Sequence, residues 1–168
     1  PLGFKDHSLL ANQLDASNTA PGIFSAAWDI NGMYQPDAID FFSTGGQNYL
    51  ITVNEGDARD YDGYSEETRL GDTDFVLDPD AFPFAEYIKH DDLLGRLNVT
   101  LATGDTDGDG DIDEIYNYGA RSMTIWNATT GELVWDSGDD FEQITANDPV
   151  YGALFNASNS NNTFKNRS

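Results

Sequence analysis

Three features are scarce in this sequence, and each absence excludes a class of protein. There is no cysteine, which excludes a disulfide framework and a thiolate zinc site. Eight lysines and arginines stand against thirty acidic residues, so the basic clusters that neutralise phosphates are missing and nucleic acid is excluded as a partner. No apolar run approaches the ~20 residues of a membrane-spanning helix, so we predict no membrane span.

The composition that is present is typical of a folded, strongly acidic domain. Of the 168 residues, 39% are hydrophobic and 12% aromatic, which suits a packed core better than a disordered acidic tail. The net charge of −22 favours cations as partners.

Two hairpin patterns dominate the chain. Apolar runs at 38–43 and 49–53 flank a glycine loop at 44–48, and strands expected at 122–126 and 132–136 flank a second turn. Short strands, tight turns and few helical patterns predict a mainly-β fold.

Hairpins of this size fit the blades of a β-propeller, which take about 40–45 residues each. We therefore predict a partial β-propeller of about three to four blades, with a β-sandwich as the competing architecture. The propeller part covers residues 1–155, and residues 156–168 form a polar tail or loop rich in glycosylation sequons. Within the propeller part we expect a long polar loop at 54–74 and a short helix within 82–97.

The run DTDGDGDID at residues 105–113 places five aspartates on alternate positions. An EF-hand loop carries a bidentate glutamate at position 12, but counting from the first aspartate that position is Tyr116. The shorter pattern D-x-D-x-D-G-x-x-D fits, and it resembles the calcium hairpins between strands of integrin-type propellers. The predicted Ca²⁺ ligands are the carboxylates of Asp105, Asp107, Asp109 and Asp113 and the carbonyl of Asp111, whose own carboxylate faces water or supports the site. The alternative is a solvated acidic turn without an ion.

The polar loop at 54–74 is a second candidate site. It could hold another cation or a catalytic carboxylate cluster through Asn54, Glu55, Asp57, Asp60 and Asp62. The alternative is a solvated loop in which Arg59 and Arg69 pair with these acids. Neither a G-x-S-x-G elbow nor a phosphate-binding G-x-x-x-x-G-K-[ST] loop occurs, and we expect His7 and His90 to be surface residues.

Five Asn-x-Ser/Thr sequons point to a secreted glycoprotein carrying N-linked glycans. Their asparagines are Asn98, Asn127, Asn156, Asn161 and Asn166. The alternative is that the polar composition of the last residues generates three of them by chance.

Several stretches, in order, resemble one family. They include PLGFKDHS, GMYQPDAI, VNEGDARDYDGYSEETR and GDTDGDGDIDEIYNYGARSMTIW, with FNASNSNNTFKNRS at the end. The chain is similar to the choice-of-anchor I proteins, a group of secreted propeller proteins that includes the mesenchyme-specific cell-surface glycoproteins linked to animal biomineralisation. The resemblance implies an internal piece of a longer extracellular propeller, with calcium bound by residues 105–113. Some bacterial members carry an alkaline phosphatase label, but no nucleophile can be assigned here, so that activity is not carried over.

Two functions follow as hypotheses. The first is a non-enzymatic, calcium-binding, N-glycosylated extracellular segment with a role in a cell surface, a matrix, a fibrous self-assembly or biomineralisation. The second is a secreted metal-dependent phosphoesterase of the alkaline phosphatase kind, with the 54–74 carboxylates holding catalytic metals.

Overall fold

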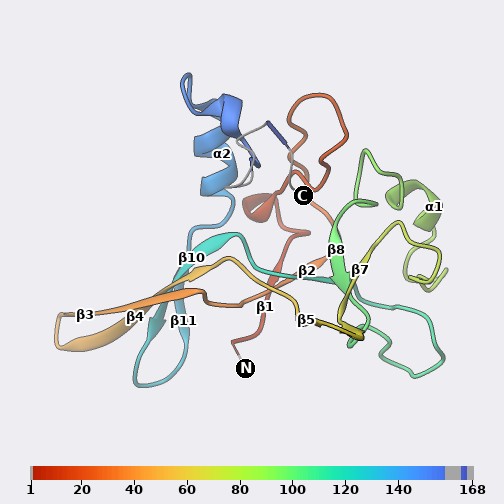
Figure 1. The fold of residues 1–168 in the computed structure, drawn as a ribbon. Helices are drawn as coiled ribbons and strands as arrows, with labels where there is room; N and C mark the ends of the chain where they lie inside the picture. The colour runs from red at the N-terminus through yellow and green to blue at the C-terminus, as the bar shows by residue number, and fades with distance from the viewer. Residues whose placement is uncertain (1, 158–163, 166–168) are drawn as a thin grey trace.

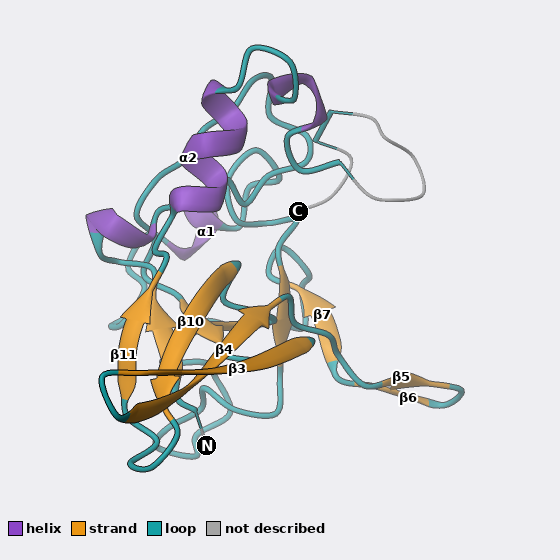
Figure 2. Ribbon diagram, turned by 90° about the vertical axis from the view of Figure 1, so that its left-hand side faces the viewer, coloured by secondary structure: helices purple, strands orange, loops and turns teal. Residues whose placement is uncertain are grey.

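The computed structural model describes residues 2–157 and 164–165, and it is mainly β, as predicted (Figure 1). Three sheets contain all of the named strands. Two short helices, α1 (Ala85–Ile88) and α2 (Asp140–Asn147), lie beyond the same end of the sheets (Figure 2). Two 3-10 turns, Leu10–Asn12 and Gly152–Leu154, complete the regular elements. No helix among the described residues is long and apolar enough to cross a membrane.

The two predicted hairpins are confirmed, and they pair with each other. The first is β3 (Ala38–Thr44) and β4 (Gln47–Asn54), and the second is β10 (Ser122–Asn127) and β11 (Leu133–Asp136). Their sheet runs β3-β4-β10-β11 with every pair antiparallel. It is therefore an up-and-down meander interrupted between its second and third strands by residues 55–121.

A five-stranded sheet takes its strands from the first third of the chain and from the interruption. Its order is β1-β2-β9-β8-β7. The strands are β1 (Phe4–Asp6), β2 (Asn31–Met33), β7 (Glu67–Arg69), β8 (Asn98–Thr100) and β9 (Tyr116–Asn117). The β2–β9 pair is parallel and the others are antiparallel.

The predicted polar loop at 54–74 is not free of secondary structure. It contains β7 and a two-stranded hairpin, β5 (Asp60–Tyr61) with β6 (Tyr64–Ser65), which extends away from the two larger sheets (Figure 2). These strands are two or three residues long and almost wholly polar, so they lack the apolar alternation by which a strand is recognised.

The hydrophobic core packs against the five-stranded sheet. Its fully buried members come from many separate segments and include Leu14, Ile30, Leu70, Phe75, Leu94, Val99 and Ile115. The described residues form no closed barrel or propeller. The two larger sheets fit the alternative that the sequence left open, a β-sandwich-like arrangement, better than they fit a propeller.

One of the two histidines was predicted wrongly. His90 lies on the surface, but His7 is only 1% exposed because it follows β1 into the interior. Its Nδ1 lies 2.6 Å from the carbonyl oxygen of Asn12, and its Nε2 has no hydrogen-bond partner in the described structure. Burial, followed by the nearby charges of Lys5 and Arg121, lowers the pKa of His7 to about 4.

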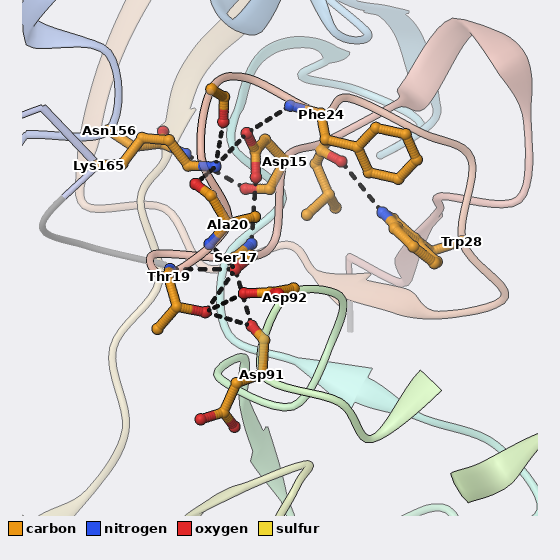
Figure 3. A network of polar contacts seen from close by, with 12 residues as sticks. Asp15, Ser17, Thr19, Ala20, Phe24, Trp28, Asp91, Asp92, Asn156 and Lys165 are labelled. Atoms are coloured by element: carbon orange, nitrogen blue, oxygen red, sulfur yellow. Dashed lines mark hydrogen bonds and ion pairs between the residues drawn. The ribbon is translucent and has the colours of Figure 1, made fainter. Parts of the chain in front are cut away.

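A buried ion pair ties a residue near the end of the chain to the beginning (Figure 3). The ammonium of Lys165 lies 2.9 Å from a carboxylate oxygen of Asp15, and both side chains are almost completely buried. The same ammonium donates to the carbonyl oxygen of Gly22 at 2.6 Å. Of the predicted polar tail at 156–168, residues 158–163 and 166–168 lie outside the described residues, whereas Lys165 is part of the interior.

Candidate cation site

The aspartate run forms a compact exposed loop between β8 and β9. Its backbone turns at Gly108 and Gly110, whose φ values are +84° and +104°, a region that glycine enters without steric cost. The carboxylate of Asp105 accepts hydrogen bonds from the N–H groups of both glycines, at 2.6 and 3.1 Å. The loop is therefore folded around its first carboxylate.

The carboxylates of the run divide into two groups. Oxygen atoms of Asp105, Asp107 and Asp109 lie within 4.8 Å of one another, and all three residues are exposed. Asp111 and Asp113 form a second group of the same spacing with Asp78. The sequence predicted a single set of ligands, and the structure brings all five aspartates close together but around two centres.

Asp78 was missed because nothing in its local sequence marks it as a ligand. A parallel bridge between Leu77 and Ile112 carries it to the loop. The N–H of Asp78 donates to the carbonyl oxygen of Ile112 at 3.0 Å, and the N–H of Ile112 donates to that of Val76 at 2.9 Å. A contact between segments more than thirty residues apart leaves no spacing signal in the sequence.

Repulsion between carboxylates has its larger effect in the second group. Loss of solvent, and then the neighbouring carboxylates of Asp109, Asp78 and Asp113, raise the pKa of Asp111 to about 6. One oxygen of Asp111 is buried without a hydrogen-bond partner, so this carboxylate does not simply face water. In contrast, hydrogen bonds from the N–H and hydroxyl of Thr106 lower the pKa of Asp113.

The first group shows the same repulsion more weakly. The N–H of Asp109 acts to lower the pKa of Asp107, but the charge of Asp109, the loss of solvent and the charges of Asp113 and Asp105 together outweigh it and raise that pKa. Crowded carboxylates of this kind are stabilised by a bound cation. Clustered oxygen donors at flexible distances are the ligands that Ca²⁺ takes, six to eight at a time.

The five residues of the predicted second site lie in two different environments. Asn54 is 1% exposed and bonds the hydroxyls of Ser122 and Thr124 inside the β4–β10 pair. The four acids are all exposed, and no three of them have oxygens within 4.8 Å of one another; they are Glu55, Asp57, Asp60 and Asp62. Within this loop, Arg59 forms an ion pair with Glu66. A second metal site here stays a prediction.

Three of the five sequon asparagines lie in the described structure, and they differ in what their amides do. Asn98 donates from Nδ2 to the carboxylate of Glu67 at 2.9 Å. Asn156 donates from Nδ2 to the carbonyl oxygen of Asp15 at 3.2 Å, and its Oδ1 accepts from Arg121. Asn127 uses only its Oδ1, which accepts from two backbone N–H groups of the β10–β11 turn. Asn161 and Asn166 lie outside the described residues.

Comparison with known proteins gives a family and one related sequence. The sequence model of the choice-of-anchor I domain matches residues 1–168. Gigasin-3a from Magallana gigas is 39% identical over 70 residues, which are 42% of this chain and 24% of that protein. The matched part thus spans about a quarter of the length of this curated relative. No solved structure is significantly similar.

Proposed function

The chain belongs to the choice-of-anchor I domain family, and from this premise we propose that it is a calcium-stabilised segment of an extracellular surface or matrix protein. The family and the Gigasin-3a relative suggest a surface or extracellular protein. The observation that carries the calcium proposal is the convergence of six aspartates into two groups of three.

The donor set fits calcium. Asp105, Asp107 and Asp109 would hold one ion, and Asp78, Asp111 and Asp113 would provide the ligands on the other side of the loop. The ligand atoms of both groups are carboxylate oxygens, which suit hard cations such as Ca²⁺ better than zinc or copper. When bound, calcium supplies the positive charge that offsets the repulsion between these carboxylates, and it would also fasten the loop to the segment that carries Asp78.

Thermal unfolding tests this proposal directly. Calcium at ~100 times its dissociation constant should add about 2.7 kcal/mol, which for a chain of this size is a rise of roughly 5–10 °C in melting temperature. The double variant Asp107→Asn plus Asp109→Asn should lose most of the rise. The control is Asp91→Asn plus Asp92→Asn, which makes the same change of charge at two exposed residues that belong to neither group and to no predicted cation site. A calcium effect that is absent, or equal in the two double variants, would refute a site in the aspartate loop.

We further propose that Asn127 carries an N-linked glycan. Its Nδ2, the atom that is glycosylated, donates no hydrogen bond within the described residues, and the turn that holds it faces solvent. The Nδ2 of Asn156 is engaged with the backbone and lies half-buried. Glycopeptide mass spectrometry of protein secreted from eukaryotic cells should find Asn127 modified and Asn156 bare; the reverse pattern would contradict the proposal.

The proposal includes a propeller as the larger architecture. The β3-β4-β10-β11 meander has the strand order of a propeller blade, and β3 is an edge strand exposed along its whole length. Such an edge needs a covering partner, either other segments of a longer chain or a further copy in a fibrous assembly. Acidic calcium-binding segments of this kind suit a matrix or biomineralisation role.

A further inference from the structure

A polar cavity of about 290 Å³ lies where five separate stretches of the chain meet, and none of its lining residues belongs to the aspartate loop. Its wall includes Glu55–Ala58 after β4, Asn117 and Tyr118 of the β9 region, and Arg121 before β10. Leu97 and Asn98 close another side. This volume is at the lower end of the range for ligand sites in proteins, so it suits a small group.

The wall is fixed by an unusually close contact between two glycines. A Cβ added to Gly56 would lie 2.0 Å from the backbone nitrogen of Gly119, and both residues have positive φ. Gln35 holds the two loops together, since its Oε1 accepts from the N–H of Gly119 at 3.0 Å and its Nε2 donates to the carbonyl of Asp57 at 2.9 Å. Arg121 beside them also has a positive φ, of 49°. Backbone strain of this kind persists only where the surrounding structure enforces it.

The groups that line the cavity are mainly hydrogen-bond acceptors. Three carboxylates contribute to its wall: Glu55, Asp57 and Glu67. The side chain of Asn117 is among the most buried in the protein, at 2% exposure, and its Oδ1 accepts no hydrogen bond. Because that oxygen is closed off from solvent, the charged acceptors that a ligand in the cavity can reach are the three carboxylates.

The charge of the cavity is negative in spite of its one cation. Arg121 pairs through Nε with Glu142, at 2.6 Å, and through Nη2 with Asn156. Its charge is therefore balanced by a carboxylate that does not line this cavity, and the three lining carboxylates are left in excess. No three of them have oxygens within 4.8 Å of one another, so they are spaced too widely to coordinate one metal ion together.

We propose that this cavity binds a primary alkylammonium group, from a lysine side chain of a partner polypeptide or from a free polyamine. An ammonium offers three donors and a positive charge, which match the three carboxylates of the wall. The methylene groups of such a ligand would lie along Leu97 and Ala58, the apolar part of the wall. This site is independent of calcium and of the aspartate loop.

The test is a binding titration of the calcium-loaded protein in 0.15 M salt, where long-range attraction to an acidic protein is screened. The probes are cadaverine, which represents the free amine, and acetyl-Gly-Lys-Gly-amide, which represents the side chain. Acetyl-Gly-norleucine-Gly-amide has a similar apolar side chain without the charge. Saturable one-to-one binding of at least one amine probe, with none of the norleucine peptide, is the expected result. Binding of cadaverine alone would identify a free amine as the ligand, and binding of both would identify the lysine side chain.

Variants locate the site. Asp57→Asn and Glu55→Gln should each weaken binding about tenfold, the effect of removing one charged hydrogen bond. Asp62→Asn makes the same charge change on the exposed β5–β6 turn and should leave the affinity unchanged. Melting temperatures of all three variants confirm that they are folded. The proposal is overturned if no amine probe saturates, or if Asp62→Asn weakens binding as much as Asp57→Asn does.

Discussion

Lowering the pH should destabilise this protein through His7. The side chain is 1% exposed, and its pKa is lowered to about 4 from a reference value of 6.5. The folded protein thus keeps the ring neutral over a range in which the unfolded chain takes up a proton. The stabilisation is complete above about pH 7 and is lost as the pH falls from 6.5 towards 4.

The size of the loss follows from the difference between the two pKa values. One pKa unit corresponds to about 1.4 kcal/mol, so the protonation of His7 should cost about 3 kcal/mol between pH 7 and pH 4. The physical cause is the interior around the ring. Its Nδ1 is already engaged with the carbonyl oxygen of Asn12, and a proton on Nε2 would find no acceptor there.

Denaturant unfolding of wild type and of His7→Gln at several pH values isolates this contribution from the many carboxylates. The difference in unfolding free energy between the two proteins should shrink by about 3 kcal/mol from pH 7 to pH 4. The control, His90→Gln, replaces a histidine whose side chain is 66% exposed, and its difference from wild type should change far less. If the His7 variant does not fold, an NMR titration of the wild-type ring gives the answer. A His7 pKa of 6 or above would refute the reasoning.

Three further tests, two of them with a comparison variant, address separate parts of the structure. Gly119→Ala would place a Cβ 1.9 Å from a backbone carbonyl oxygen, whereas Gly63→Ala meets no atom within 4 Å. Both glycines have positive φ, so Gly63→Ala should lower the free energy of unfolding by about 1–2 kcal/mol. Gly119→Ala should lower it clearly more, as measured by chemical denaturation. Equal losses would contradict the close contact at Gly119. Trp126→Phe removes an indole N–H that bonds two buried threonine hydroxyls. The free energy of unfolding should therefore fall by about 1–3 kcal/mol. This is more than we expect for Trp135→Phe, because the side chain of Trp135 is 42% exposed. Asp78→Asn should at least halve the calcium-dependent rise in melting temperature, and an unchanged rise would remove that residue from the site.

The parts of the fold that the sequence predicted are those encoded locally. The hairpin of β3 and β4 follows from apolar runs on either side of two glycines that turn the chain, at φ values of +57° and +78°. The aspartate loop is likewise a local pattern of ligand spacing. Both features depend on neighbours within about ten residues, which is the range that a sequence pattern samples.

The parts that it did not predict depend on long-range contacts. Asp78 joins the aspartates only through the bridge between residues 77 and 112, and His7 is buried because the strand before it pairs with β2. In the sequence, His7 and His90 have equally polar neighbours. Asn54, which looked like a loop ligand, closes β4 and points into the sheet because its partner strand returns only at Ser122.

The interrupted meander has a consequence for how the protein is made. Strand β4 ends at Asn54 and pairs with β10, which begins at Ser122. At a synthesis rate of about 5–20 residues per second, the first hairpin is made roughly 3–13 s before its partner strand. During that interval the apolar side of β4 has no neighbour, although a β-hairpin itself forms in about 1–10 μs. The nascent chain therefore carries β4 with one edge unpaired until residues 122–127 have been made.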